Sequence, residues 1–235
     1  PLANFWVQLQ TFDEQLTKTI KNYKSSHPDP ETAKELFINS KEIVGDKSVD
    51  GIERAAAFYI VNKCSFSGLT ESSSFSKQAS SSNFSMRGIE KLPEYAELIS
   101  HWHINQYSYE YLMRENVHDG IFMYLDPPYE IKIPIYGKRG AMHKYFDHDK
   151  FAEDCNESKI NMMISYNSSQ QIKERFKDWN VAEYDLTYSM RTTGDYMREQ
   201  KERKELLLMN YGPKVKLSFD GCYNYKKLKD EGLAA

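Results

Sequence analysis

The sequence predicts an α/β fold built on a largely parallel sheet, and three observations favour this class. Apolar side chains recur at helical spacing through most of residues 2–63. From residue 120 onward, short apolar runs alternate with helical segments, which is typical of parallel strands joined by crossovers. One apolar run, 120–125, ends abruptly at Asp126-Pro127-Pro128-Tyr129. Prolines lack the N–H donor of a strand ladder, so the chain must leave the sheet there.

The first half of the chain is expected to be mainly helical. Residues 2–24 are expected to form a single helix, which the following Pro residues end. The apolar side chains that recur at helical spacing in it are Leu2, Phe5, Trp6, Leu9, Phe12, Leu16 and Ile20. The further elements predicted in this half are helices at 31–45, 49–63, 93–100 and 109–116, and a short strand at 103–107. Residues 65–85 are rich in Ser with isolated Phe and Lys, which is typical of a mobile surface loop.

The second half is expected to supply the sheet. After Tyr129 comes a basic, Gly-containing loop, 137–144, which is either a solvated loop or a lid over a substrate. The elements predicted beyond it are a helix capped by Asp147 and running to 156, a strand at 160–165, a Ser-capped helix at 168–179, a strand at 181–188, a basic loop at 191–204 and a strand at 206–209. Residues 213–235 are Lys-rich and receive no assignment.

Composition excludes several classes of protein. The 31 Lys and Arg residues against 34 Asp and Glu residues give a net charge of −3, so the chain lacks the overall basic signature of a nucleic-acid binder. A nucleic-acid-binding surface would therefore have to be built from local basic loops. The three cysteines are an odd number without metal-ligand spacing, which favours a reducing compartment and disfavours a disulfide scaffold. We expect no metal site, no signal peptide and no membrane span.

The order of several motifs resembles one family, the Dam-type (D12 class) DNA adenine N6-methyltransferases. The segments that carry the resemblance are Tyr124–Tyr129, Ala55–Leu69, Ser165-Tyr166-Asn167, Tyr188-Ser189-Met190, Glu205–Tyr211 and Leu2–Phe12. Tyr124–Tyr129 matches the catalytic motif in its standard form, and Ala55–Leu69 resembles the segment that opens the target-recognition region. The resemblance covers residues 2–211.

The resemblance implies a Rossmann-like, S-adenosylmethionine-dependent methyltransferase sheet with an inserted, mainly helical target-recognition region. The expected domains are a helical part of the methyltransferase domain at 1–50, a target-recognition region at 51–118, the catalytic half of the sheet at 119–211 and a tail at 212–235. It also implies a site-specific DNA-methyltransferase of restriction-modification type that methylates a flipped adenine in double-stranded DNA. We expect such a protein in the cytoplasm of a prokaryotic cell or of a virus-infected host cell.

The same resemblance assigns roles to residues. The catalytic residues would be Asp126, Pro127, Pro128 and Tyr129, and the cofactor-binding residues Asp126, Ser108 and Tyr109. The expected DNA-binding residues are Ser65, Phe66, Ser67, Lys77, Arg87, Lys138, Arg139, Lys144 and Arg191. Asp126 and the carbonyl of Pro127 would accept hydrogen bonds from the adenine amino group, and Tyr129 would stack on the base.

The chain departs from the family pattern at the cofactor loop. The family's Phe-x-Gly-Gly loop and its ribose-binding acidic residue precede the helix that opens this chain, and neither Gly137–Gly140 nor Thr193-Gly194-Asp195 replaces the loop. We therefore expect the N-terminal strand or strands of the sheet to be missing here, with the Gly-rich loop supplied by an N-terminal segment or a second chain. The alternatives are a catalytically silent structural or interaction subunit, for example of a virus or a multi-chain complex, and cytosine N4 methylation.

Overall fold

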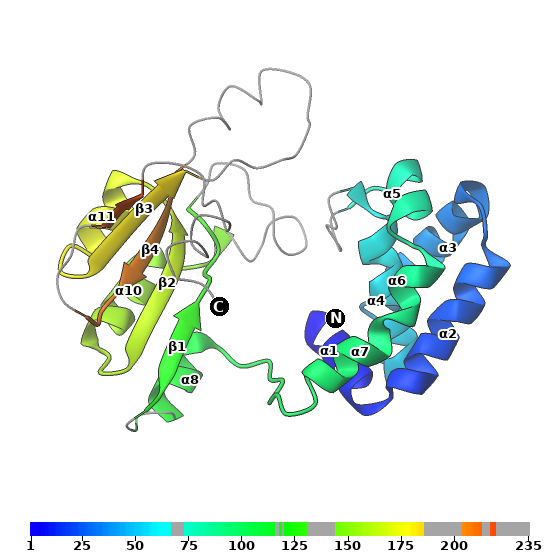
Figure 1. The fold of residues 1–235 in the computed structure, drawn as a ribbon, viewed down its shortest axis with the longest axis horizontal. Helices are drawn as coiled ribbons and strands as arrows, with labels where there is room; N and C mark the ends of the chain where they lie inside the picture. The colour runs from blue at the N-terminus through cyan, green and yellow to red at the C-terminus, as the bar shows by residue number, and fades with distance from the viewer. Residues whose placement is uncertain are drawn as a thin grey trace, which may run out of the picture. The chain divides into compact units, whose positions relative to one another are not determined.

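The structure is a computed structural model that describes residues 1–66, 73–115, 118, 120–130, 144–185, 204–212 and 217–219. The chain divides into two compact units between Tyr107 and Ser108, one helical and one built on a sheet (Figure 1). Each unit has its own hydrophobic core, and each is described separately.

The helical unit is organised around α4 (Gly51–Cys64), which is buried on nearly every side. Its Ala55-Ala56-Ala57 run leaves little side-chain bulk, so α1, α2 and α3 pack closely against it. Asp29 and Asp50 cap α3 and α4 by accepting hydrogen bonds from backbone N–H groups of the first turn. The other helices of this unit are α1 (Leu2–Thr11), α2 (Asp13–Ser26), α3 (Pro30–Ile43), α5 (Lys77–Ser82), α6 (Met86–Glu90) and α7 (Leu92–Leu98). The predicted helices at 31–45, 49–63 and 93–100 are thus confirmed.

The single helix predicted over 2–24 is wrong, because the chain breaks at Phe12. That residue has φ −137° and ψ 43°, and α2 starts directly after it with Asp13 and Glu14. Acidic side chains in a first turn complement the positive end of the helix dipole, which favours a new start. Leu9 and Leu16 nevertheless lie in one core, so the apolar periodicity continues across the break.

Two other predictions for this unit need correction. Ser76 caps α5 by accepting a hydrogen bond from the Ala79 N–H, so part of the predicted mobile loop is a helix. Phe75 packs edge-on against Phe37 with 5.7 Å between ring centroids, and Phe84 is fully buried. Phe75 and Phe84 therefore anchor the Ser-rich segment to the core, while residues 67–72 lie outside the described residues. The short strand predicted at 103–107 does not form.

The second unit contains a mixed five-stranded sheet in the order β1-β2-β4-β3-β5. Its elements are α8 (Tyr109–Glu115), β1 (Phe122–Leu125), α10 (His148–Glu157), β2 (Asn161–Asn167), α11 (Gln170–Arg175), β3 (Asn180–Asp185), β4 (Lys204–Met209) and β5 (Leu217–Phe219). β1 runs parallel to β2, and β3 parallel to β5, whereas β4 is antiparallel to both of its neighbours. This combination of helices with a mixed parallel and antiparallel sheet is consistent with a methyltransferase fold.

The predicted largely parallel arrangement is therefore wrong at β4. Its run Leu206-Leu207-Leu208 is mostly buried because β4 lies between two strands, and this burial does not depend on strand direction. The predicted strands and the Asp147-capped helix are confirmed within the described residues. The helix predicted at 168–179 is shorter, since Ser169 rather than Ser168 caps α11. β5 was not predicted.

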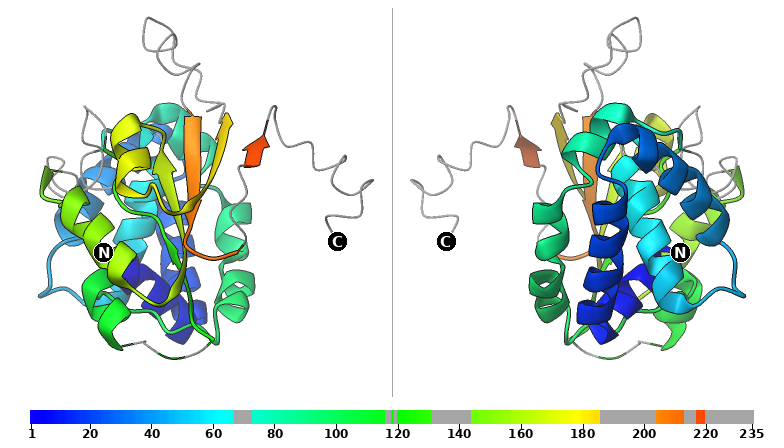
Figure 2. Two further views of the ribbon diagram at one scale, coloured as in Figure 1. Left: turned by 90° about the vertical axis from the view of Figure 1, so that its left-hand side faces the viewer. Right: turned by 90° about the vertical axis from the view of Figure 1, so that its right-hand side faces the viewer.

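The two faces of the sheet differ. In the left view of Figure 2, α8, α10 and α11 lie on one side of the strands. Their Phe151 and Ile172 side chains pack with Ile164 and Leu208 of the central strands in the core of this unit. On β1, Phe122 and Tyr124 project the other way and are 52% and 57% exposed. The candidate site lies at one end of this second face.

The two described cysteines give separate probes of the two cores. Cys64 is fully buried in the helical unit and Cys155 in the sheet unit, and burial raises the pKa of each thiol to about 12. Because the thiolate is the reactive form, we expect iodoacetamide at pH 8 to label both at least about 10²-fold more slowly in the native protein than in urea. Peptide mapping by mass spectrometry measures each rate. Labelling of either native thiol at the unfolded rate would contradict its burial.

Candidate active site

The candidate site lies where β1 and β2 end. The two strands are parallel and Leu125 pairs with Ile164, so Asp126 and Ser165 follow at the same edge of the sheet. The Ser165 hydroxyl donates to Oδ1 of Asp126 at 2.9 Å, and the Tyr124 hydroxyl donates to the Ser165 oxygen at 3.0 Å. Ser165 is buried while Asp126 is exposed, so a fixed hydroxyl orients an accessible carboxylate. This leaves Oδ2 of Asp126 as an acceptor.

The turn after Asp126 is fixed by side chains from β2 and α11. The Glu130 N–H donates to Oδ1 of Asn167 at 3.0 Å, and the Asn167 amide donates back to the Glu130 carbonyl at 3.4 Å. Arg175 pairs with the Glu130 carboxylate at 2.8 Å and with Asp149 at 2.7 Å, and these hydrogen bonds raise the pKa of its guanidinium. Both ends of the Pro-Pro turn are thus held in place, which favours a preformed site.

Contacts with β2 and β4 hold Tyr129 at the end of the turn. Its hydroxyl donates to Oε2 of Glu205 at 2.6 Å, and its ring stacks on Tyr166 with centroids 6.1 Å apart. Glu205 is only 5% exposed and belongs to β4. Tyr166 is buried, which raises the pKa of its hydroxyl, and this hydroxyl shares a hydrogen bond with Nδ1 of His148. The Tyr129 ring therefore has a defined position at the edge of the sheet.

Tyr184 of β3 belongs to the same group of side chains. Burial raises the pKa of its hydroxyl, and the negative charge of Glu205, its register partner on β4, raises it further. Tyr124 and Asp126 act in the same direction with smaller effects, so both lie near this hydroxyl. The end of this face thus combines two carboxylates, of Asp126 and Glu205, with four hydroxyls, of Tyr124, Tyr129, Ser165 and Tyr184. Such a site can accept hydrogen bonds from an amino group and favours positive charge.

The two other residues predicted to bind cofactor have structural contacts on α8. The Ser108 hydroxyl accepts a hydrogen bond from the Tyr111 N–H at 3.4 Å, and so caps the helix. The Tyr109 hydroxyl donates to Asp154 at 2.9 Å and its ring packs against Phe151, with burial raising the pKa of the hydroxyl. Their role in cofactor binding stays a prediction.

The predicted DNA-binding residues are spread over both units. In the helical unit, Ser65 is buried and donates to the Asn62 carbonyl at 3.1 Å, whereas Phe66 is 53% exposed. Lys77 forms a surface ion pair with Glu31 at 2.9 Å. Arg87 is exposed on α6, and Lys144 is exposed in the sheet unit. Ser67, Lys138, Arg139 and Arg191 lie outside the described residues. The binding role of this set stays a prediction.

Sequence reasoning assigned no role to Ser165, Glu205 or Tyr124. The sequence does contain a signal for Ser165 and Glu205, because each is a polar residue next to an apolar run. Met162–Ile164 precedes Ser165, and Leu206–Leu208 follows Glu205. A buried polar side chain in such a position needs a hydrogen-bond partner, and both partners here belong to the Asp126–Tyr129 motif.

The described residues contain neither a candidate metal site nor a candidate membrane span. In that part of the chain, no three His, Cys, Asp or Glu side chains are grouped so that they could hold a metal ion. Nor does any described helix have the length and apolar character needed to cross a bilayer.

Comparison with known proteins decides the family. A sequence model of the D12 class N6 adenine-specific DNA methyltransferases matches residues 1–190, which include the helical unit and most of the sheet described above. The chain belongs to this family. It is also 26% identical over 232 residues to the type II methyltransferase M1.LlaDCHI of Lactococcus lactis subsp. cremoris, covering 90% of this chain and 76% of the relative.

Membership of the D12 class confirms the resemblance on which the site assignment was based. The matched region includes the Asp126–Tyr129 motif at the end of β1 and the Ser165–Asn167 segment at the end of β2. The family description also specifies adenine N6, rather than cytosine N4, as the position that these enzymes methylate.

Proposed function

We propose that this chain transfers a methyl group from S-adenosylmethionine to N6 of a flipped adenine in DNA. The observation that carries the proposal is the Asp126 carboxylate, oriented by the buried Ser165 hydroxyl at 2.9 Å and followed by a Pro-Pro turn fixed at both ends. A purely structural turn would not require an exposed carboxylate held in one orientation.

The chemical difficulty is that the adenine amino group is a poor nucleophile, because its lone pair is delocalised into the ring. Oδ2 of Asp126 would accept one N–H of this group, and the Pro127 carbonyl the other. Both contacts favour tetrahedral geometry at nitrogen and direct its lone pair toward the methyl donor. Tyr129, supported by Tyr166 and Glu205, would stack on the base. This is catalysis by orientation and electrostatic preorganisation.

The oxygens at the end of β1 fit a positively charged cofactor. S-adenosylmethionine supplies a methyl group activated by a sulfonium centre, as in methyltransferases generally. The Asp126 carboxylate and the neighbouring hydroxyls offer acceptors for positive or amino groups, and Ser108 and Tyr109 remain proposed contacts. Among the described residues, β1 has a strand neighbour only in β2. A further segment or a second chain that pairs with its outer edge would bring the Gly-rich loop of the family to this site.

The proposed partner is double-stranded DNA in the cytoplasm. N6 of adenine lies inside the base stack, so the nucleotide must turn out of the duplex to reach Asp126. The negative net charge of the chain means that phosphate contacts would come from local cations such as Arg87 and Lys144. Binding through such contacts should weaken steeply as salt concentration rises.

A methyl-transfer assay tests the proposal. The purified chain is incubated with S-adenosylmethionine and unmethylated genomic DNA, and the nucleosides are then analysed by mass spectrometry. We expect N6-methyladenine as the product. N4-methylcytosine would indicate the cytosine alternative. No product, together with no calorimetric binding of S-adenosylmethionine to the chain or to the chain with a co-purifying partner, would support the silent structural subunit instead.

A further inference from the structure

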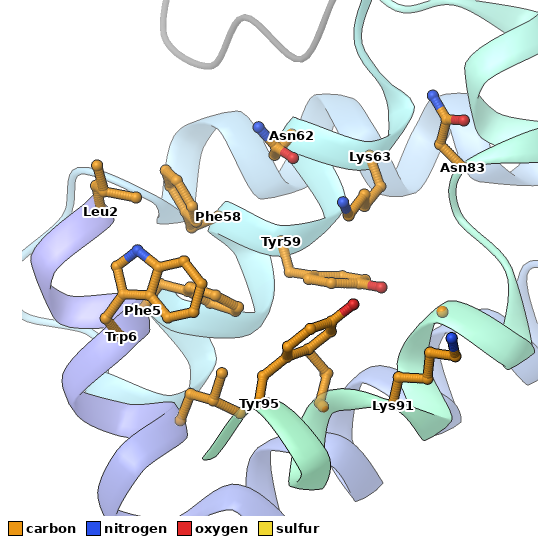
Figure 3. Close-up of a pocket in the computed structure, with 13 residues that line it drawn as sticks. Leu2, Phe5, Trp6, Phe58, Tyr59, Asn62, Lys63, Asn83, Lys91 and Tyr95 are labelled. Atoms are coloured by element: carbon orange, nitrogen blue, oxygen red, sulfur yellow. The ribbon is translucent and has the colours of Figure 1, made fainter. Parts of the chain in front are cut away.

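A pocket of about 280 Å³ lies wholly within the helical unit (Figure 3). One end is apolar and aromatic, with Leu2 and Trp6 of α1 and Phe58 of α4. The other end carries hydroxyl, amine and amide groups from α4 and from the α6–α7 region. The pocket is therefore amphiphilic, and its volume is near the lower limit of small-molecule sites.

Two tyrosine hydroxyls lie at the polar end. Tyr59 is only 4% exposed, yet its hydroxyl has no hydrogen-bond partner among the described residues. Figure 3 shows this hydroxyl and that of Tyr95 pointing toward each other. Burial, together with the nearby Tyr95, raises the pKa of Tyr59 to about 12, so the hydroxyl stays protonated near neutral pH. Because Tyr59 lines the pocket, a bound ligand or a water molecule can accept a hydrogen bond from its hydroxyl.

Positive charge lies beside these hydroxyls. The Lys63 ammonium is 5.6 Å from the centroid of the Tyr59 ring, and Lys91 lines the same end of the pocket (Figure 3). Neither lysine forms an ion pair with a carboxylate in the described part of the chain. Two ammonium groups and two hydroxyls offer more donors than a single carboxylate can use. They suit a phosphate, which has three terminal oxygens and up to two negative charges.

The aromatic end suits a planar ring at a short distance from that phosphate. Trp6 and the Tyr95 ring, which is 46% exposed, provide surfaces on which a base can stack. We propose that this pocket binds one nucleoside monophosphate unit, with its phosphate between Lys63 and Lys91 and its base against Trp6 and Tyr95. The site is separate from Asp126–Tyr129 and does not depend on methyl transfer.

The test is calorimetric titration of the full chain with 5′-dAMP. We expect binding, and at least about tenfold weaker binding to the Lys63→Met/Lys91→Met variant, because charge-assisted contacts to phosphate are lost. The matched control is Lys34→Met/Lys47→Met, which removes the same charge from exposed positions of the same unit outside the pocket. Tyr95→Ala should weaken 5′-dAMP binding but leave the thermal midpoint close to that of the parent chain.

Three results would overturn the proposal. The first is no binding of 5′-dAMP, and the second is equal binding of inorganic phosphate, which would exclude a role for the base. The third is loss of binding in Asp126→Ala but not in the lysine variant, which would place the nucleotide at the catalytic turn. A short single-stranded oligonucleotide, added as a competitor of 5′-dAMP, shows whether the pocket takes a nucleotide of a DNA strand or a free nucleotide. If the oligonucleotide displaces 5′-dAMP, the natural ligand is a nucleotide within a DNA strand. If it does not, the natural ligand is a free nucleotide, and in both cases the pocket is a nucleotide site.

Discussion

Replacement of Asp126 by alanine or asparagine is expected to lower the rate of methyl transfer by about 10²-fold or more, the usual effect of removing one preorganised electrostatic contact. The carboxylate is the acceptor that the proposed reaction needs at the amino nitrogen, and neither variant retains its charge. Asp126 is exposed, so its loss should leave the core intact. The rate is measured by transfer of labelled methyl to DNA, and stability by urea unfolding.

Asp178→Asn is the matched control for this experiment. Asp178 is an exposed carboxylate of the sheet unit, and the change removes the same charge away from the turn. We expect full activity from this variant. If Asp126→Ala and Asp178→Asn were equally active, Asp126 would have no role in transfer. If Asp126→Ala lost activity only because it unfolded, its urea midpoint would fall as well.

The part of the site that could be predicted from sequence is the part encoded locally. A strand was predicted at 120–125 and β1 spans Phe122–Leu125, because an apolar run followed by two prolines permits few conformations. The helix caps at Asp29 and Asp147 act within three residues along the chain, and the helices that they cap lie close to the predicted bounds. Local chemistry therefore defined the catalytic turn and most of the helices.

The contacts that orient the turn could not be predicted in this way, since they join distant parts of the chain. Ser165 is 39 residues from Asp126, and Glu205 is 76 residues from Tyr129. Each contact depends on strand order and register, and hydrophobic patterns did not reveal the direction of β4. The break at Phe12 was missed for a related reason, because α1 and α2 bury their apolar side chains in one core. Composition likewise did not show that aromatic residues anchor the Ser-rich segment.

The Tyr129–Glu205 hydrogen bond provides a second large effect. Tyr129→Phe removes the donor at 2.6 Å from a carboxylate that is only 5% exposed, so we expect the free energy of unfolding to fall by about 1–3 kcal/mol. The ring would also lose a contact that positions it beside the proposed adenine site. We therefore expect kcat to fall about tenfold, because small displacements of positioning groups are costly. Urea unfolding and the methyl-transfer assay measure the two effects.

A double-mutant cycle separates this hydrogen bond from other effects of the two residues. If Tyr129 and Glu205 act as a pair, Glu205→Gln and Tyr129→Phe will each be destabilising, and their combination will cost less than the sum of the two. The controls are Tyr145→Phe and Glu157→Gln, which make the same chemical changes at exposed positions of the sheet unit. Additive losses would show that the two residues act independently. Coupling in stability together with coupling in kcat would show that β4, the antiparallel strand, positions the catalytic turn through Glu205.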